Sequence, residues 1–130
     1  GLSMEWQDLS WSINGKRILR GITGLMEPGH VTAVLGPSGS GKSSLLNILA
    51  GRQRTSGPAG SAPLTGRISV EGAAVDVSEF KSNIAYVMQD DSLMATETPR
   101  ECINFSAYLR RPGPAAEREQ MVSTMLSTLG

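Results

Sequence analysis

The stretch that decides the fold is Gly36-Pro37-Ser38-Gly39-Ser40-Gly41-Lys42-Ser43, which fits the pattern G-x-x-x-x-G-K-[ST]. This pattern is typical of a loop that wraps the phosphates of a nucleoside triphosphate. Residues 31–35 before it predict a short buried strand, and residues 44–50 predict a helix directly after it. Because strand, glycine loop and helix follow in this order, we interpret the segment as a phosphate-binding loop rather than a glycine-rich turn with a chance lysine.

Each residue type in this loop has a physical role. The glycines allow turns that side chains would block, so successive N–H groups can point at phosphate oxygens. The helix that starts near Gly41 adds its positive end. The Lys42 ammonium can reach the β- and γ-phosphates, and the Ser43 hydroxyl can ligate the Mg²⁺ that bridges them. The candidate nucleotide-binding residues here are Gly36, Pro37, Ser38, Gly39, Ser40, Gly41, Lys42, Ser43 and Ser44.

Composition limits the class of protein without deciding it. The 130 residues, 39% of them hydrophobic and 18% charged, suit about one globular domain. Twelve basic and twelve acidic residues give no net charge, and a nucleic-acid surface would need clustered lysine and arginine. A single cysteine (Cys102) excludes an internal disulfide, and a single histidine (His30) excludes histidine-based metal sites. No apolar stretch approaches the roughly 18 residues of a membrane helix and no leader pattern opens the chain, which predicts a soluble segment.

Strand patterns lie on both sides of the loop. Residues 4–13 alternate apolar and polar side chains, and Asn14-Gly15 predicts a tight turn into a second strand at 16–22. A further antiparallel strand is expected at 67–72, and 84–89 is expected to be a buried strand. Mixed strands would then flank one core.

The remaining segments are predicted to be loop and helix. Residues 51–66 are rich in glycine, proline, serine and threonine, which favours an exposed flexible loop. Thr98-Pro99-Arg100-Glu101 combines an N-cap, a first-turn proline and a capping-box glutamate. A break at 111–114 separates this helix from a second one, closed by Gly130. The predicted apolar faces are Cys102, Phe105, Ser106 and Leu109 in the first helix and Met121, Val122, Met125, Leu126 and Leu129 in the second.

Two separated motifs and the stretch between them resemble a known family. The run from Gly36 to Gly51, followed by Tyr86-Val87-Met88-Gln89-Asp90-Asp91, is similar to the first half of an ABC-transporter nucleotide-binding domain. The Gln-Asp-Asp ending and the lead-in Gly24-Leu25-Met26-Glu27-Pro28-Gly29 resemble the G, or White, subfamily. The resemblance implies an α/β P-loop NTPase with an ABC-type ATPase core sheet, an antiparallel β subdomain and the start of a helical subdomain. Residues 1–130 would then be a partial, truncated nucleotide-binding domain.

The resemblance also implies ATP and Mg²⁺ as ligands and gives Gln89 a role. In the family this glutamine contacts Mg²⁺ and the attacking water, and the loop after it meets the transmembrane domain. A neutral amide suits the task because it offers an oxygen to a hard cation and a donor to an oxyanion. Ser43 and Gln89 are therefore the implied metal ligands. From the residues alone, Gln89 is an ordinary polar residue at a strand end.

The family often places an aromatic ring against the adenine, near the end of the first strand. Trp11 lies near that point and Ile13 occupies the aligned position, and both are expected on one strand face. We predict that Trp11 or Ile13 touches the base. The alternative is that Trp11 is a core residue.

Parts of the family's site do not occur by Gly130: the LSGGQ-like signature, the apolar strand ending in Asp-Glu and the switch histidine, for which His30 lies in the wrong place. We expect a parent protein that hydrolyses ATP to drive export, at the cytoplasmic face of a membrane. Its expected partners are a transmembrane domain and a second nucleotide-binding domain, without nucleic acid. Alone, the chain is expected to bind nucleotide poorly and to lack steady ATPase activity, since the general base is missing.

Two other functions remain open at this point. The loop also resembles that of guanylate kinase, although here a hairpin precedes it and no arginine-rich substrate segment follows soon after. Phosphate transfer from ATP to GMP would identify such a kinase. The other alternative is a soluble ABC ATPase of translation or DNA repair, which the zero net charge opposes only mildly. The transported substrate, its direction and the membrane are not predicted.

Overall fold

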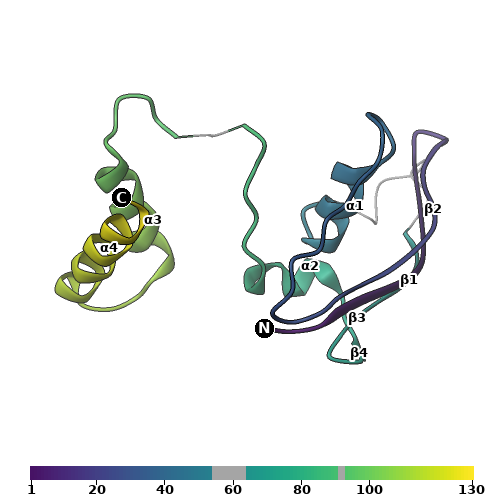
Figure 1. Ribbon diagram of the computed structural model, residues 1–130, viewed down its shortest axis with the longest axis horizontal. Coiled ribbons are helices and arrows are strands. Elements are labelled where there is room, and N and C mark those ends of the chain that lie inside the picture. Colours follow the sequence, from purple (N-terminus) through teal and green to yellow (C-terminus); the bar gives the residue numbers. More distant parts are fainter. Residues whose placement is uncertain (54–63, 91–92) are drawn as a thin grey trace. The chain divides into compact units, whose positions relative to one another are not determined.

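The computed structural model describes residues 1–53, 64–90 and 93–130. The chain forms two compact units, Gly1–Val87 and Met88–Gly130 (Figure 1). Most of the loop expected at 51–66 lies outside the described residues.

The first unit is built on a four-stranded antiparallel sheet in the order β2-β1-β3-β4 (Figure 1). Its strands are β1 (Met4–Ile13), β2 (Lys16–Met26), β3 (Thr65–Val70) and β4 (Ala73–Ala74). Asn14-Gly15 joins β1 to β2 with φ values of 49° and 74°, as a two-residue hairpin turn requires. The predicted hairpin is thus confirmed, and β2 runs further than expected.

The third predicted strand ends earlier in the structure than expected, because a second tight turn follows it. We expected the strand to cover 67–72, but Glu71 and Gly72 have φ values of 50° and 77° and form the turn between β3 and β4. Left-handed backbone at both positions suits a two-residue hairpin, not an extended strand. The Glu71 carboxylate accepts hydrogen bonds from Ser3, which lower its pKa.

A β-bulge at Asp8 decides which side chains of β1 are buried. The register shifts across this residue in both pairings of β1, and Asp8 has a φ of 50°. On a regular strand Trp6 and Leu9 would face opposite sides, but the extra residue brings Trp6, Leu9 and Trp11 into one buried cluster. Gly66 of β3 fits against the bulge, since a Cβ there would lie 2.5 Å from the Asp8 carbonyl oxygen.

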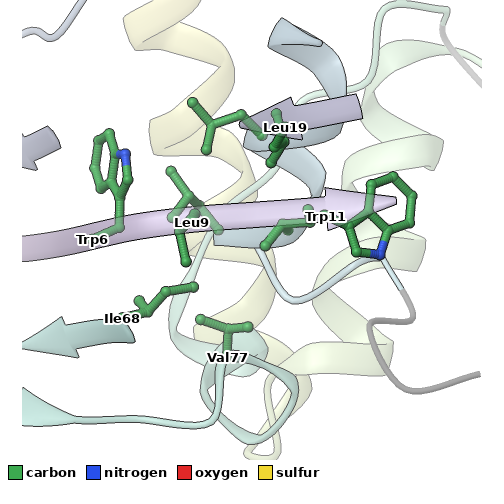
Figure 2. Packing of buried hydrophobic residues seen from close by; sticks show 9 residues of the cluster. Trp6, Leu9, Trp11, Leu19, Ile68 and Val77 are labelled. Atoms are coloured by element: carbon green, nitrogen blue, oxygen red, sulfur yellow. The ribbon is translucent and has the colours of Figure 1, made fainter. Parts of the chain in front are cut away.

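Helix α1 (Lys42–Leu49) packs its apolar residues on this sheet. It begins two residues earlier than predicted because Gly41 is its N-cap, and the Gly41 carbonyl accepts the Leu45 N–H at 2.9 Å. Figure 2 shows Leu9 between the two tryptophans along β1, with neighbours from the adjoining strands and from α2. The buried cluster consists of Trp6, Leu9, Trp11, Leu19, Leu45, Ile48, Leu49, Ile68 and Val77.

A short helical segment closes the first unit. Helix α2 (Val77–Phe80) is capped by Asp76, whose carboxylate accepts the Ser78 N–H at 2.8 Å, and η1 (Lys81–Asn83) follows directly. The bonds from Ser78 hold the Asp76 pKa below its ordinary value. Gly51, at the end of α1, lies so close to Val77 that a Cβ would sit 2.1 Å from the Val77 carbonyl oxygen. This glycine therefore lets α1 and α2 meet.

The predictions of strands at 31–35 and 84–89 are wrong for this structure. Neither segment belongs to the sheet that the described residues form. Leu35 is 90% exposed and Val87 94% exposed. A strand exists only through hydrogen bonds to a neighbour, and no described segment pairs with either run. Both runs are apolar, but the part of the chain that the structure describes offers neither of them a paired strand.

The second unit is a helical hairpin of α3 (Pro99–Arg110) and α4 (Ala115–Leu129), side by side in Figure 1. The capping box predicted at Thr98 and Glu101 is present, and Gly130 closes α4 through its N–H. Val122 of α4 is buried against α3, and the half-buried residues of α3 include Cys102. Three residues of the predicted α3 face, Phe105, Ser106 and Leu109, are exposed instead. Among the described helices, none combines the length and apolarity needed to cross a bilayer.

Candidate nucleotide-binding site

The predicted phosphate loop is a tight turn ordered by its glycines. The Ser40 N–H donates to the Pro37 carbonyl at 3.3 Å. Gly39 and Gly41 have φ values of 77° and 95°, a left-handed conformation that side chains disfavour. The glycine spacing of the motif thus meets a backbone requirement at two of its positions.

The Lys42 ammonium is held inside the turn of the loop. Its Nζ donates to the carbonyl oxygens of Gly36 and Pro37, at 2.7 Å in each case, and lies 3.5 Å from the Ser40 hydroxyl. A Cβ on Gly36 would sit 2.9 Å from that hydroxyl oxygen. A positive charge therefore lies among backbone groups where the motif places phosphate oxygens.

The β-hairpin supports the loop through Gly41. A Cβ there would lie 3.1 Å from the Ile18 carbonyl oxygen and 3.2 Å from a methyl of Leu19, which is itself buried in the core. The glycine is therefore required both by its φ and by this close approach. Through Leu19, the position of the loop depends on the packed sheet.

The amino-terminal turn of α1 suits an anion. No acidic residue occurs in it, so the positive end of the helix dipole has no carboxylate to offset it. Ser43 is exposed and Ser44 is half-buried at this end. The hydroxyl of Ser43 is thus accessible, as a metal ligand must be.

The two residues predicted to touch the base differ in environment. Trp11 is 5% exposed within the core, and its Nε1 has no hydrogen-bond partner, whereas Ile13 is 38% exposed at the end of β1. The register of β1 against β2 shifts between Trp11 and Ser12. Although Trp11 and Ile13 were expected on one strand face, only Trp11 is therefore buried.

Gln89 lies in the second unit and is exposed in a bend. The phosphate loop belongs to the first unit. The role of Gln89 toward Mg²⁺ stays a prediction. Among the residues that the structure describes, no group of three or more His, Cys, Asp or Glu side chains could hold a metal ion.

The family described as ABC transporter matches residues 19–130 of this chain. The chain belongs to the ABC transporter family. It is 36% identical over 135 residues to ABC transporter G family member 22 of Dictyostelium discoideum, covering 99% of this chain and 21% of that protein. The chain is 42% identical over 117 residues to Broad substrate specificity ATP-binding cassette transporter ABCG2 of Rattus norvegicus, covering 88% of this chain and 17% of that protein. It is 40% identical over 124 residues to ABC transporter G family member STR2 of Medicago truncatula, covering 95% of this chain and 16% of that protein.

These similarities confirm that the chain is part of an ABC transporter ATP-binding domain related to the G subfamily. The chain spans about a fifth of the length of the curated relatives it matches. Membership of the ABC transporter family excludes the nucleotide-kinase alternative. The glycine loop and α1 both lie inside the residues that match the family.

Sequence reasoning missed one connection beside the site. The Tyr86 hydroxyl donates to the Asn47 side-chain oxygen of α1 at 2.6 Å, and the Arg52 guanidinium lies 4.5 Å above the centre of the Tyr86 ring. Both Asn47 and Tyr86 occur in the motifs quoted for the ABC transporter family, but their spacing of 39 positions hides the contact. A tyrosine inside an otherwise apolar run was the available signal.

Proposed function

We propose that this chain is the ATP-binding part of the nucleotide-binding domain of a G-type ABC transporter that hydrolyses ATP to drive export across a membrane. The observation that carries the proposal is the glycine loop turned around the Lys42 ammonium at the start of α1. Family membership supports ATP as the nucleotide. The relatives named as transporters favour transport over a soluble ATPase of translation or DNA repair.

Within this proposal the phosphates would be bound by the loop backbone and by Lys42. The ammonium already has oxygen partners at 2.7 Å, and phosphate oxygens would form stronger, charge-assisted bonds in their place. Ser43 and Gln89 would hold Mg²⁺. The bound ion would neutralise charge between the β- and γ-phosphates. Backbone N–H groups of the loop and of α1 would complete the anion site.

For the adenine base we propose Ile13 rather than Trp11. Ile13 offers accessible apolar surface at the end of β1, while the Trp11 ring is packed in the core. Ile13→Ala should weaken ATP binding and leave the affinity for tripolyphosphate unchanged, because tripolyphosphate has no base. Equal weakening of both ligands would contradict a base contact.

The expected core sheet also belongs to the proposal. The runs 31–35 and 84–89 would pair with strands other than those of the sheet that the described residues form. Their exposed apolar side chains support this, since burial of such chains normally drives strand pairing. The partners proposed are a transmembrane domain and a second nucleotide-binding domain, with the site at the cytoplasmic face of the membrane.

The direct test is Mg-ATP affinity of the protein as its gene encodes it. Lys42→Ala should lower the affinity about ten- to hundredfold, because a hydrogen bond to a charged group contributes about 1.5–3 kcal/mol. Lys81→Ala removes an exposed lysine of η1 and is the matched control, expected to be neutral. Equal affinity of the wild type and Lys42→Ala would overturn the proposed site.

A further inference from the structure

Three side chains from two segments meet beside α1. The Tyr86 hydroxyl donates to Asn47 Oδ1 at 2.6 Å, and both groups are partly buried. The Arg52 guanidinium stacks over the Tyr86 ring, with 4.5 Å between the guanidinium carbon and the ring centre. The phenol is therefore held at its edge by the amide and on its face by the cation.

The backbone at the end of α1 fixes these partners. The Asn47 carbonyl accepts the N–H groups of Arg52 and Gln53, at 2.8 and 3.2 Å. Gly51, which precedes Arg52, has a left-handed φ of 65°. A left-handed residue at this position ends a helix so that its last carbonyl groups are hydrogen-bonded. Asn47 and Arg52 are thus held by one helix terminus, which presents both to Tyr86.

The contact joins two functional segments of the chain. Asn47 lies on the helix that begins at Lys42, directly after the phosphate loop. Tyr86 precedes Gln89 in the run 84–89. The neighbouring Val87 is 94% exposed, so burial of that side chain does not hold the run in place. The hydrogen bond at Tyr86 is a directional link between this run and α1.

From this we infer that Tyr86 and Asn47 are positioning residues, which couple the helix of the phosphate loop to the segment that carries Gln89. The inference rests on the proposed function, because it gives Gln89 its task at Mg²⁺. If the tether sets where that segment starts, breaking it should impair the Mg²⁺-dependent part of nucleotide binding. It should not impair the phosphate contacts that the loop makes without the metal.

The variants follow from the chemistry of the bond. Tyr86→Phe removes the donor and keeps the ring under Arg52. Asn47→Leu removes the acceptor with a good helix former. Asn47→Asp keeps an oxygen acceptor and is the rescue control. Each variant is first checked for folding by thermal unfolding, so that loss of structure is recognised.

The experiment measures the affinity of a fluorescent ATP analogue for the gene-encoded protein, in Mg²⁺ and in EDTA. Tyr86→Phe and Asn47→Leu should reduce the gain in affinity caused by Mg²⁺ about two- to tenfold, the range of one hydrogen bond. Affinity in EDTA should be unchanged, and Asn47→Asp should behave as the wild type. Added to Gln89→Ala, Tyr86→Phe should cause little further loss, because both act on one step.

Two results would overturn the inference. Equal losses with and without Mg²⁺ would show a purely structural role for Tyr86, and an unchanged Mg²⁺ gain would show no role in coupling. Lys42→Ala is measured in parallel. If it leaves affinity unchanged, the proposed function fails as well, whereas an effect of Lys42→Ala without any effect of Tyr86→Phe overturns the coupling alone.

Discussion

Leu9 and Leu35 lie in two strand-like sequences of the first unit, yet Leu9 is fully buried and Leu35 is 90% exposed. Leu9 belongs to β1, which pairs with β2 through a two-residue turn and with β3 on its other edge. Among the described residues, the run around Leu35 has no paired neighbour. An antiparallel partner needs only a tight turn, while a parallel partner needs a crossover of about a dozen residues or more. Apolar sequence alone therefore does not bury a strand.

The largest expected effect compares these two leucines directly. Leu9→Ala should destabilise the chain by about 2–5 kcal/mol, because it leaves a cavity in a packed core. Leu35→Ala should change stability by less than about 0.5 kcal/mol, as exposed substitutions do. Urea unfolding of both variants measures the difference. Similar losses would mean that the exposed run is packed after all.

The packing of β1 on β2 can be tested at Gly24. A Cβ there would lie 2.4 Å from the Trp6 ring, so Gly24→Ala should cost about 1–3 kcal/mol through overpacking. Combining it with Trp6→Leu removes the obstructing ring, and the double variant should lose less than the sum of the single losses. Strictly additive losses in urea unfolding would argue against this contact.

The second unit depends more on local signals, and its cap should matter less. Thr98→Ala removes the side chain that accepts the Glu101 N–H at the start of α3. The loss should be about 1 kcal/mol, typical of an N-cap. Amide hydrogen exchange in α3 measures it, with the exposed Ser127→Ala in α4 as the control. Unchanged exchange in α3 would contradict a stabilising cap.

The smallest effect is a pH dependence of the same cap. Hydrogen bonds from Thr98 hold the pKa of Glu101 below its ordinary value of 4.5. Because the folded pKa is lowered, the stabilisation is present above pH 4.5 and is lost as the pH falls through the lower folded value. Glu101→Gln should remove this dependence. Cα chemical shifts of the first turn of α3, followed from pH 6 to about pH 2, measure it.

The features that could be predicted from the sequence are local ones, which depend on residues close together in the chain. The Asn14-Gly15 turn, the loop glycines and the Thr98 cap act within a few positions, and each appears as expected. The bulge at Asp8 was not predictable, because it depends on pairing with two other strands. The turn at Glu71-Gly72 had a glycine signal, but glutamate is a weaker partner there than asparagine or aspartate.

The candidate site likewise has parts that a local motif predicts and parts that depend on contacts between distant residues. Residues 36–43 follow a contiguous motif, so the loop and the role proposed for Lys42 could be predicted. The tether from Tyr86 to Asn47 joins residues far apart in sequence, which no local pattern reveals. The unequal burial of Trp11 and Ile13 follows from a register shift, which strand alternation does not predict.

Steady-state ATP hydrolysis is the measurement that decides whether these residues bind ATP within a larger hydrolysing domain, as we propose. We expect no sustained hydrolysis by isolated residues 1–130. We expect the gene-encoded protein to hydrolyse ATP, with this activity abolished by Lys42→Ala and retained by Lys81→Ala. Sustained turnover by residues 1–130 that Lys42→Ala removes, or hydrolysis by the gene-encoded protein that Lys42→Ala leaves unchanged, would contradict this proposal.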